Sequence, residues 1–353
     1  MQSGWVAPIG PDIDAFESDL ALASGRHHAV ALSSGTAAIH LGLLAFGVEP
    51  GAEVLVPTLT FGATAFAVVH AGARPVFLDV EEESWNLDPS LLESHLRVKA
   101  AEARLPAAVI PVDVFGRTAD YDSIMRICRE FEVPVLVDSA EALGAMHGDS
   151  PAGSIGNAAI FSFNGNKIIT TSGGGALVTN DPEIARKIRH WATQSREPFP
   201  WYEHEEIGYN YRMSNILAAL GRVQLARLPE IVERRRAIRE RYAATLETVP
   251  GVTVMGDPPW GAWNGWLTTM RFDLSMHPNA PTLIREALET HDIESRPVWK
   301  PMHQQPVFKD SECVLTGVAD RLFNEGLCLP SGTAMTDIDV DRVLGVMLET
   351  LGR

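Results

Sequence analysis

The sequence predicts an α/β protein built around a mostly parallel sheet with helices on both faces. The alternation of strand-like and helix-like segments predicts it. From about residue 30 to residue 195, short apolar runs with strand character alternate with segments whose apolar residues recur at helical spacing. A helical crossover returns the chain to the same edge of the sheet, so successive strands run parallel. The chain has 353 residues, which is enough for two domains.

Each expected element follows from its own apolar pattern. In the first part, strands are predicted over residues 53–56, 75–80, 107–113, 133–137, 158–163 and 176–179, and helices over 64–70, 89–103, 121–131 and 182–193. Apolar residues at helical spacing over 225–248 predict a long helix that leads into a smaller domain. We therefore expect a large domain over residues 1–225 and a small C-terminal domain over 226–353. In the small domain, a strand is predicted over 266–272 and helices over 281–290 and 337–351.

Composition excludes several classes of protein. The net charge of −16 argues against nucleic-acid binding and against an anionic membrane surface, so an anionic ligand would need local groups such as helix N-termini. Cys128, Cys313 and Cys328 are widely spaced, which predicts neither a disulfide framework nor a metal site and fits a cytoplasmic protein. Residues 1–8 lack the features of a signal peptide, and no apolar run reaches the roughly 20 residues of a membrane span.

One lysine stands apart from all other charges. Lys167 follows the predicted strand 158–163, precedes the glycines at 173–175, and has no charged residue within eight positions on either side. A lysine held away from water can attack a carbonyl as the free amine, as a Schiff base with pyridoxal phosphate (PLP) requires. The ordinary alternative is a lysine in a polar loop beside a glycine turn.

Two further features suit an anionic aromatic cofactor. Ser34, Gly35 and Thr36 stand at the start of an apolar helix, where amides, a hydroxyl and the positive helix end could bind phosphate. Asp138 follows the strand 133–137, and a carboxylate at the end of a parallel strand could pair with a protonated pyridine nitrogen. An ordinary helix cap is the alternative at both places.

Other signals in the same order strengthen this interpretation. Phe61 follows the strand 53–56 and could stack on a flat ring, while Ser162, five residues before Lys167, could add a hydroxyl to the phosphate site. No Gly-x-Gly-x-x-Gly motif follows a strand, which disfavours a nicotinamide cofactor.

Five motifs follow one another along the chain: Ser34-Gly-Thr-Ala37, Pro57-Thr-Leu-Thr-Phe61, Asp138-Ser-Ala-Glu-Ala-Leu-Gly144, Phe161-Ser-Phe-Asn-Gly-Asn-Lys167 and Gly208-Tyr-Asn-Tyr-Arg-Met-Ser-Asn215. In this order they resemble those of the DegT-type PLP-dependent nucleotide-sugar aminotransferases of fold type I, and the resemblance covers nearly the whole chain. Two departures stand out: Ser172-Gly-Gly-Gly175 replaces the usual Gly-Glu-Gly-Gly, and relatives carry an extra stretch before Trp5.

The resemblance implies a role for each matching residue. Lys167 would form the Schiff base and shuttle the proton between cofactor and substrate, and Asp138 would bind the pyridine nitrogen. Glu141 stands where relatives usually have Gln or His near the ring hydroxyl. The remaining cofactor contacts would come from Gly35, Thr36, Ala37 and Ser162 at the phosphate, from Phe61 stacked on the ring, and from Asn210 of the neighbouring subunit.

The resemblance also implies partners and a substrate. Contacts across the subunit boundary imply a homodimer with shared active sites, and Arg212 is the alternative to Asn210 or a substrate ligand. The segment Arg296-Pro-Val-Trp-Lys-Pro-Met-His303 resembles that of relatives that aminate UDP-linked 4-keto-6-deoxy sugars in the bacillosamine pathway. Arg296 and Lys300 could supply cations for a diphosphate, and His303 a hydrogen bond. A surface loop with incidental charges is the alternative.

The function expected from the resemblance is a ping-pong transfer of an amino group from glutamate to C4 of a nucleotide-linked 4-keto-6-deoxyhexose, with a UDP-linked 2-acetamido sugar favoured. A 3-keto sugar aminotransferase and a non-catalytic PLP-binding sensor remain alternatives. A sugar 3-dehydratase of the same fold is disfavoured, because those relatives replace the lysine by histidine and this chain keeps Lys167.

Overall fold

The larger part of the chain is organised around a central sheet. The computed structural model describes residues 4–353, so residues 1–3, the first of the predicted large domain and of the segment inspected for a signal peptide, lie outside the described residues. The strands are β1 (His28–Leu32), β2 (Glu53–Pro57), β3 (Arg74–Leu78), β4 (Ala108–Val109), β5 (Leu136–Asp138), β8 (Ala158–Ser162), β9 (Gly175–Thr179) and β14 (Cys313–Val314). They form the segments β14-β3-β2-β4 and β5-β8-β9-β1, joined by parallel bridges at Val109–Val135 and Val112–Asp138.

The mostly parallel character of the sheet is confirmed, with β9 as the exception. The pairs β2–β3, β2–β4, β3–β14 and β5–β8 are parallel, whereas β9 is antiparallel to both β8 and β1. The reason lies in the connection. Residues 163–174 join β8 to β9 without a crossover helix, so the chain must turn back on itself.

Helices cover both faces, as expected. One core contains residues of α2 (Gly35–Ala45), α3 (Gly62–His70) and α6 (Pro182–Ala192), and the other contains residues of α1 (Pro11–Ala23), α4 (Pro89–Ala101), α5 (Tyr121–Glu130) and α7 (Asn215–Ala226). Successive residues of β8 alternate between them: Ala159 and Phe161 belong to one core, Ala158 and Ile160 to the other. Burial on both faces explains why this strand is apolar from Ala158 to Phe161, before it ends at Ser162.

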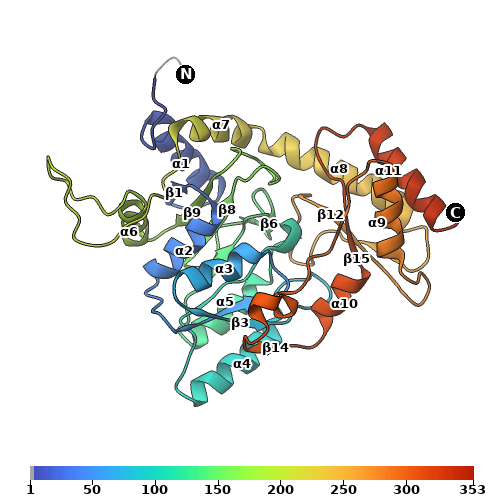
Figure 1. Ribbon diagram of the computed structural model, residues 1–353, viewed down its shortest axis with the longest axis horizontal. Helices are drawn as coiled ribbons and strands as arrows, with labels where there is room; N and C mark the ends of the chain where they lie inside the picture. The colour runs from blue at the N-terminus through green and yellow to red at the C-terminus, as the bar shows by residue number, and fades with distance from the viewer. Residues whose placement is uncertain (1–3) are drawn as a thin grey trace.

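The smaller part lies at the C-terminal end of the molecule (Figure 1). Its sheet has the order β10-β12-β15-β13. The helices α8 and α9 pack against the sheet, and α11 packs against these two helices, around a core of their own. The bounds are α8 (Leu228–Leu246), β10 (Val252–Val254), β12 (Thr268–Phe272), α9 (Ala280–Thr290), β13 (Arg296–Pro297), α10 (Val318–Glu325), β15 (Gly326–Leu329) and α11 (Asp337–Thr350).

Three expectations need correction in detail. The single helix expected over 225–248 is two helices, α7 and α8, which break at Arg227; Pro229 lies in the first turn of α8, where its missing N–H costs little. The strand expected over 107–113 pairs regularly only at β4 and then through isolated bridges, and the strand expected over 133–137 pairs as β5, over Leu136–Asp138. The other expected helices and strands are present, with bounds shifted by a few residues at most.

The division at residues 225 and 226 stays a prediction. The segment after β13 returns to the larger part, where β14 pairs with β3, so the C-terminal region is tied to the central sheet. A three-stranded sheet makes a second tie: β11 (Gly261–Ala262) pairs with β6 (Met146–His147), which pairs with β7 (Ser150–Pro151).

Within residues 4–353, every helix is too short or too polar to cross a lipid bilayer. Cys128, Cys313 and Cys328 are free thiols.

Candidate active site

A cavity of about 780 Å³ lies where β2, β5 and β8 end. Thr60, Asp138 and Ser162 line it from the central sheet, and the segments 294–296 and 328–335 line it from the smaller part. Clefts at the carboxyl ends of parallel strands are the usual place for ligands in α/β proteins, because the connecting loops diverge there. The cavity contains most of the residues that the sequence singles out.

The start of α2 forms one end of the cavity. Ser34 is the N-cap, and its Oγ accepts a hydrogen bond from the Ala37 amide at 3.0 Å. The amides of Gly35 and Thr36, in the first turn, have no partner within the helix and line the cavity with the Ser162 hydroxyl. Gly35 is needed here, since a Cβ at this position would lie 3.0 Å from the Ser162 Cβ. The amides of Gly35 and Thr36 and the hydroxyls of Ser34 and Ser162 thus form a cradle suited to an anion.

Two features of the cradle bear on how it could bind a phosphate: the engagement of the Ala37 amide and the few basic side chains nearby. The Ala37 amide is already engaged by its cap and Ala37 is buried behind the cradle, so its predicted part in phosphate binding would have to be indirect. Among residues 4–353, Lys167 and Arg296 are the only basic side chains that line the cavity. A dianionic phosphate in the cradle would therefore rely on helix dipole, amides and hydroxyls unless another subunit adds a group.

Asp138 lies at the end of β5 and is only 5% exposed. Its Oδ2 accepts a hydrogen bond from Thr64 Oγ1 at 2.7 Å, and its Oδ1 accepts one from the Ala140 amide at 3.1 Å. Burial raises the pKa of Asp138, and the Thr64 hydroxyl, the Ala140 amide and the charge of Lys167 oppose the rise. A cationic ring nitrogen beside this carboxylate would compensate for its burial. The sequence did not single out Thr64, although Thr60 and Thr64 follow β2 at helical spacing and bond to each other at 2.8 Å.

Lys167 meets Glu141 inside the cavity. Lys167 Nζ donates to Glu141 Oε1 at 2.9 Å, and Glu141 Oε2 accepts the Phe115 amide at 2.8 Å. Glu141 is 3% exposed, and burial raises its pKa from 4.5 to about 7, against the effect of Lys167. The pair places a primary amine within hydrogen-bond distance of a buried carboxyl group whose own pKa is raised towards neutral pH.

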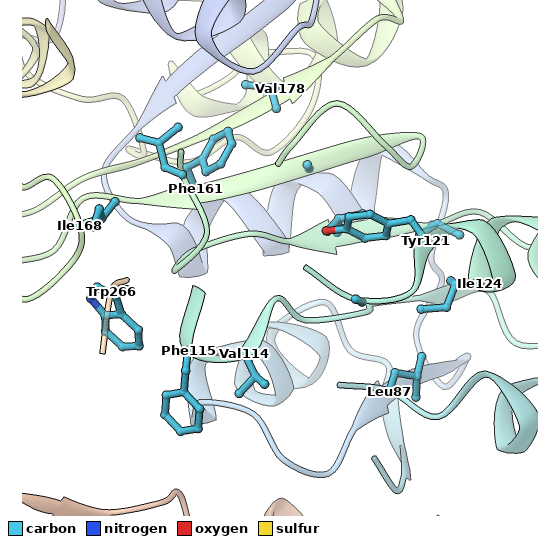
Figure 2. Close-up of a cluster of buried hydrophobic side chains, with 14 of the residues drawn as sticks. Leu87, Val114, Phe115, Tyr121, Ile124, Phe161, Ile168, Val178 and Trp266 are labelled. Atoms are coloured by element: carbon cyan, nitrogen blue, oxygen red, sulfur yellow. The ribbon is translucent and has the colours of Figure 1, made fainter. Parts of the chain in front are cut away.

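Aromatic rings surround this pair. Lys167 Nζ lies 4.6 Å from the ring centroid of Trp266 and 5.9 Å from that of Phe61. Trp299 packs against Phe61 at 5.8 Å and against Phe115 at 4.6 Å. Figure 2 shows the Trp266 indole beside the Phe115 ring. Sequence reasoning missed Phe115, Trp266 and Trp299 as site residues. Phe115 and Trp266 belong to no quoted motif, and in the segment from Arg296 to His303 attention went to the charged and polar side chains rather than to Trp299.

Several predicted ligands are not brought into the cavity. The Arg212 guanidinium is bound to Glu17 and to the Ala31 carbonyl, so it is not free for a substrate anion. Lys300 is exposed outside the cavity. His303 bridges Thr58 and Asp320, at 2.7 and 2.9 Å, and has a structural role in this arrangement.

Two other predicted ligands, Arg296 and Asn210, have exposed side chains that could still contact a ligand. Arg296 lines the cavity with a side chain that is 75% exposed and paired to Glu294 at 2.5 Å. Asn210 is exposed and lies on the segment between α6 and α7, outside the cavity of its own chain. Its backbone forms an isolated antiparallel β-bridge with Thr193. A second subunit would be required for Asn210 to reach a phosphate.

Replacement of Glu141 by glutamine is expected to remove part of the pH dependence of folding. The folded protein holds the Glu141 proton more tightly than the unfolded chain does, so this group destabilises the fold as the pH rises from about 4.5 through 7. In Glu141→Gln, the free energy of unfolding of the cofactor-free protein should fall less between pH 5 and pH 8, by about 1–3 kcal/mol. Urea titration at both pH values measures this, with exposed Glu183→Gln as control. Parallel pH profiles for Glu141→Gln and the wild type would contradict it.

The arrangement fits PLP. The cradle matches a phosphate, the buried carboxyl group of Asp138 matches a basic ring nitrogen, and Lys167 supplies the amine that can attach the aldehyde, with Phe61 available to cover the ring. The glycine at position 174, with φ of +154°, carries the backbone close to Met213 and Thr171 behind the cavity.

Comparisons with known proteins agree with this interpretation. The model of the DegT/DnrJ/EryC1/StrS aminotransferase family matches residues 1–348. The chain is 44% identical to EpsN of Bacillus subtilis, whose name describes a pyridoxal phosphate-dependent aminotransferase, over 98% of this chain and 90% of that protein. It is 36% identical to GDP-perosamine synthase of Caulobacter vibrioides, over 99% and 93%. A solved DegT/DnrJ/EryC1/StrS aminotransferase from Brucella abortus superimposes with a TM-score of 0.91 at 30% identity, covering 100% of this chain and 93% of that one.

Proposed function

The chain belongs to the DegT/DnrJ/EryC1/StrS aminotransferase family, and we propose that it transfers an amino group from glutamate to the C4 ketone of a nucleotide-linked 4-keto-6-deoxyhexose. It has the fold of type I PLP-dependent enzymes and is a PLP-dependent sugar aminotransferase. The finer proposal is supported by one observation above all. A single cavity contains the Lys167–Glu141 pair and the anion cradle, and the exposed guanidinium of Arg296, paired to Glu294, also lines it.

Four residues of the chain do the chemical work in this proposal. When bound, PLP supplies an electron sink and carries the amino group between the two substrates. Lys167 Nζ attaches the cofactor and, once released from it, moves the proton at the reacting carbon. Glu141 accepts or returns a proton at Lys167 Nζ, over the 2.9 Å contact between them. Asp138 keeps the ring nitrogen protonated, and Phe61 covers the ring and limits its contact with water.

The substrate class follows from charge and from the relatives. The chain carries a net charge of −16, so a nucleotide diphosphate needs fixed cations close to the cavity. In this proposal Arg296 binds the diphosphate: it lines the cavity, and a phosphate could replace Glu294 as the partner of its exposed guanidinium. The name GDP-perosamine synthase points to a nucleotide-linked amino sugar for that relative. We favour a UDP-linked 2-acetamido sugar because of the segment from Arg296 to His303, with GDP- and dTDP-linked sugars as the alternatives to test.

The deciding experiment is a single turnover of the aminated cofactor. The enzyme is first treated with glutamate and separated from it, and 4-keto and 3-keto sugars on UDP, dTDP and GDP are then added one at a time. We expect 4-keto-6-deoxy sugars to restore the PLP absorbance fastest. Restoration by 3-keto sugars or simple 2-keto acids alone would assign the enzyme to another substrate class, and failure of glutamate to bleach the PLP absorbance would favour a non-catalytic sensor.

We also propose that the active unit is a homodimer. The segment between α6 and α7 projects from the body of the molecule (Figure 1) and exposes the stacked rings of Phe199 and Trp201. Tyr202 and Ile207 on this segment are exposed as well. Large apolar side chains that gather on a projecting segment are typical of an interface. A second copy covering this segment would bring Asn210 of one subunit towards the cradle of the other, where its side-chain amide could donate to a phosphate oxygen.

Shared sites predict complementation between two inactive variants. In a hybrid of Lys167→Ala and Asn210→Ala subunits, one site has both residues intact and the other has neither. Random pairing makes half of the dimers hybrid, so co-expression should restore about a quarter of the wild-type specific activity. Each variant expressed alone is the control. Full activity of Asn210→Ala alone, or no recovery in isolated hybrids, would contradict a shared site.

A further inference from the structure

A buried tetrapeptide at the edge of the smaller part donates side-chain hydrogen bonds to three loops around the cavity. This donor clamp is Trp263-Asn264-Gly265-Trp266, between β11 and β12. All three of its side chains are buried, and each donates to backbone carbonyls of a different loop. Trp263 Nε1 donates to Phe115 O at 2.7 Å, Asn264 Nδ2 to Glu141 O at 2.7 Å and Leu143 O at 3.0 Å, and Trp266 Nε1 to Asn166 O at 2.7 Å.

The clamp is itself held in one conformation. Asn264 Oδ1 accepts the Trp266 amide at 2.9 Å, which orients the side-chain amide and directs its Nδ2 towards Glu141. Gly116 approaches so closely that a Cβ there would lie 2.1 Å from Asn264 Oδ1. Gly265 has φ of +77°, and a Cβ there would lie 2.9 Å from the Arg235 Cβ. A fixed set of donors is what precise loop placement requires.

The three gripped loops include both partners of the Lys167–Glu141 contact. Asn264 fixes the backbone of Glu141, and Trp266 fixes the backbone of Asn166, the residue before Lys167. The face of the same indole lies 4.6 Å from Lys167 Nζ, so Trp266 both holds the loop and attracts the ammonium group. Each contact alone is modest, but together they leave Lys167 Nζ between a carboxylate and an aromatic face.

We propose that Trp266 and Asn264 are positioning residues that hold Lys167 against Glu141. The consequence for catalysis rests on the proposed role of Lys167. The position of Lys167 relative to Glu141 and Trp266 can be tested without substrate. One residue separates the clamp from β12, so Trp266 links the sheet of the smaller part to the amine of Lys167.

The test is the rate at which Lys167 is acetylated in the cofactor-free protein, measured by peptide mass spectrometry with trace acetic anhydride. Trp266→Phe keeps an aromatic face and loses the donor to Asn166, whereas Trp266→Leu loses both. We expect Lys167 to react about two- to fivefold faster in Trp266→Leu and to change less in Trp266→Phe. Trp260→Phe is the matched control, because its indole donates to Thr118 O at 2.9 Å outside the cavity.

Two internal references separate positioning from loss of stability. Lys187 is exposed and reports the reagent dose, while Lys99 is buried in ion pairs with Glu53 and Glu312 and reports general loosening of the fold. A rise confined to Lys167 supports the proposal. An equal rise at Lys99, or an unchanged Lys167 in both Trp266 variants, overturns it. Neither result depends on turnover, so an error in the proposed function would not imitate either one.

Discussion

Replacement of Lys167 by alanine is expected to abolish turnover and covalent attachment of PLP. Lys167 is the only lysine that lines the cavity among residues 4–353, and it lies 2.9 Å from Glu141 in a water-poor, aromatic environment. Loss of its role in proton transfer alone should cost about 10²–10⁴-fold in kcat, and loss of the attachment adds to this. Activity assays, with borohydride reduction and peptide mapping of the cofactor, measure both effects.

The control for this variant is Lys187→Ala, which removes an exposed lysine of α6 and should leave activity and labelling unchanged. The fold should survive Lys167→Ala, since the variant leaves the clamp and the cradle intact. Retained turnover in Lys167→Ala, or a reduced cofactor attached to another lysine of the wild type, would show that the wrong residue carries the chemistry.

The sequence was informative where one short segment supplies both the residue and its position. Gly35 and Thr36 follow their cap, Asp138 ends its strand, and Lys167 follows β8 at a distance that keeps it at the same edge of the sheet. In a parallel sheet the carboxyl ends of the strands lie along one edge, so residues that follow different strands in the sequence lie close together in space. The α/β fold and the location of the cavity could therefore be predicted from local patterns.

The remaining site residues depend on tertiary contacts that no local pattern encodes. Trp266 reaches Lys167 only because β11 pairs with β6 and β12 joins the sheet of the smaller part. Arg212 shows the converse. Its motif is intact, but Glu17, nearly 200 positions away, occupies its guanidinium. A motif gives the type of residue at a position, and the partner that decides its role can come from anywhere in the chain.

Glu141 illustrates how one such contact changes the chemistry. A neutral side chain in its place would only donate to or accept from a ring hydroxyl, whereas a carboxyl group with a pKa of about 7 can be either neutral or charged near neutral pH. Its second oxygen is fixed by the amide of Phe115, a residue with φ of +54°. Backbone in this left-handed region is uncommon for a bulky residue and is found at sites where function constrains the chain.

The second large effect is expected from Asp138→Asn, which tests whether Asp138 is a cofactor ligand or a simple cap. Asparagine keeps an oxygen that can accept from Thr64, but it cannot form an ion pair with a ring nitrogen. Burial raises the pKa of Asp138, so removing this charge should leave the cofactor-free fold at least as stable at neutral pH. We expect kcat to fall by about 10²-fold or more, as for loss of a buried electrostatic partner of the reacting group.

The matched control is Asp181→Asn at the N-cap of α6, where the carboxylate accepts the Glu183 amide at 2.8 Å. Asp138 makes a similar contact to the Ala140 amide at 3.1 Å and also accepts from Thr64 at 2.7 Å. If it served only to hold the turn, Asp138→Asn would cost at most one of these hydrogen bonds and, like Asp181→Asn, would change kcat little. Asparagine caps nearly as well as aspartate, and Asp181→Asn should therefore change stability and activity little. Steady-state kinetics and thermal unfolding of both variants decide the matter. A large loss of kcat in Asp138→Asn at unchanged unfolding temperature assigns the carboxylate to the chemistry, and two equally mild variants assign it to the turn.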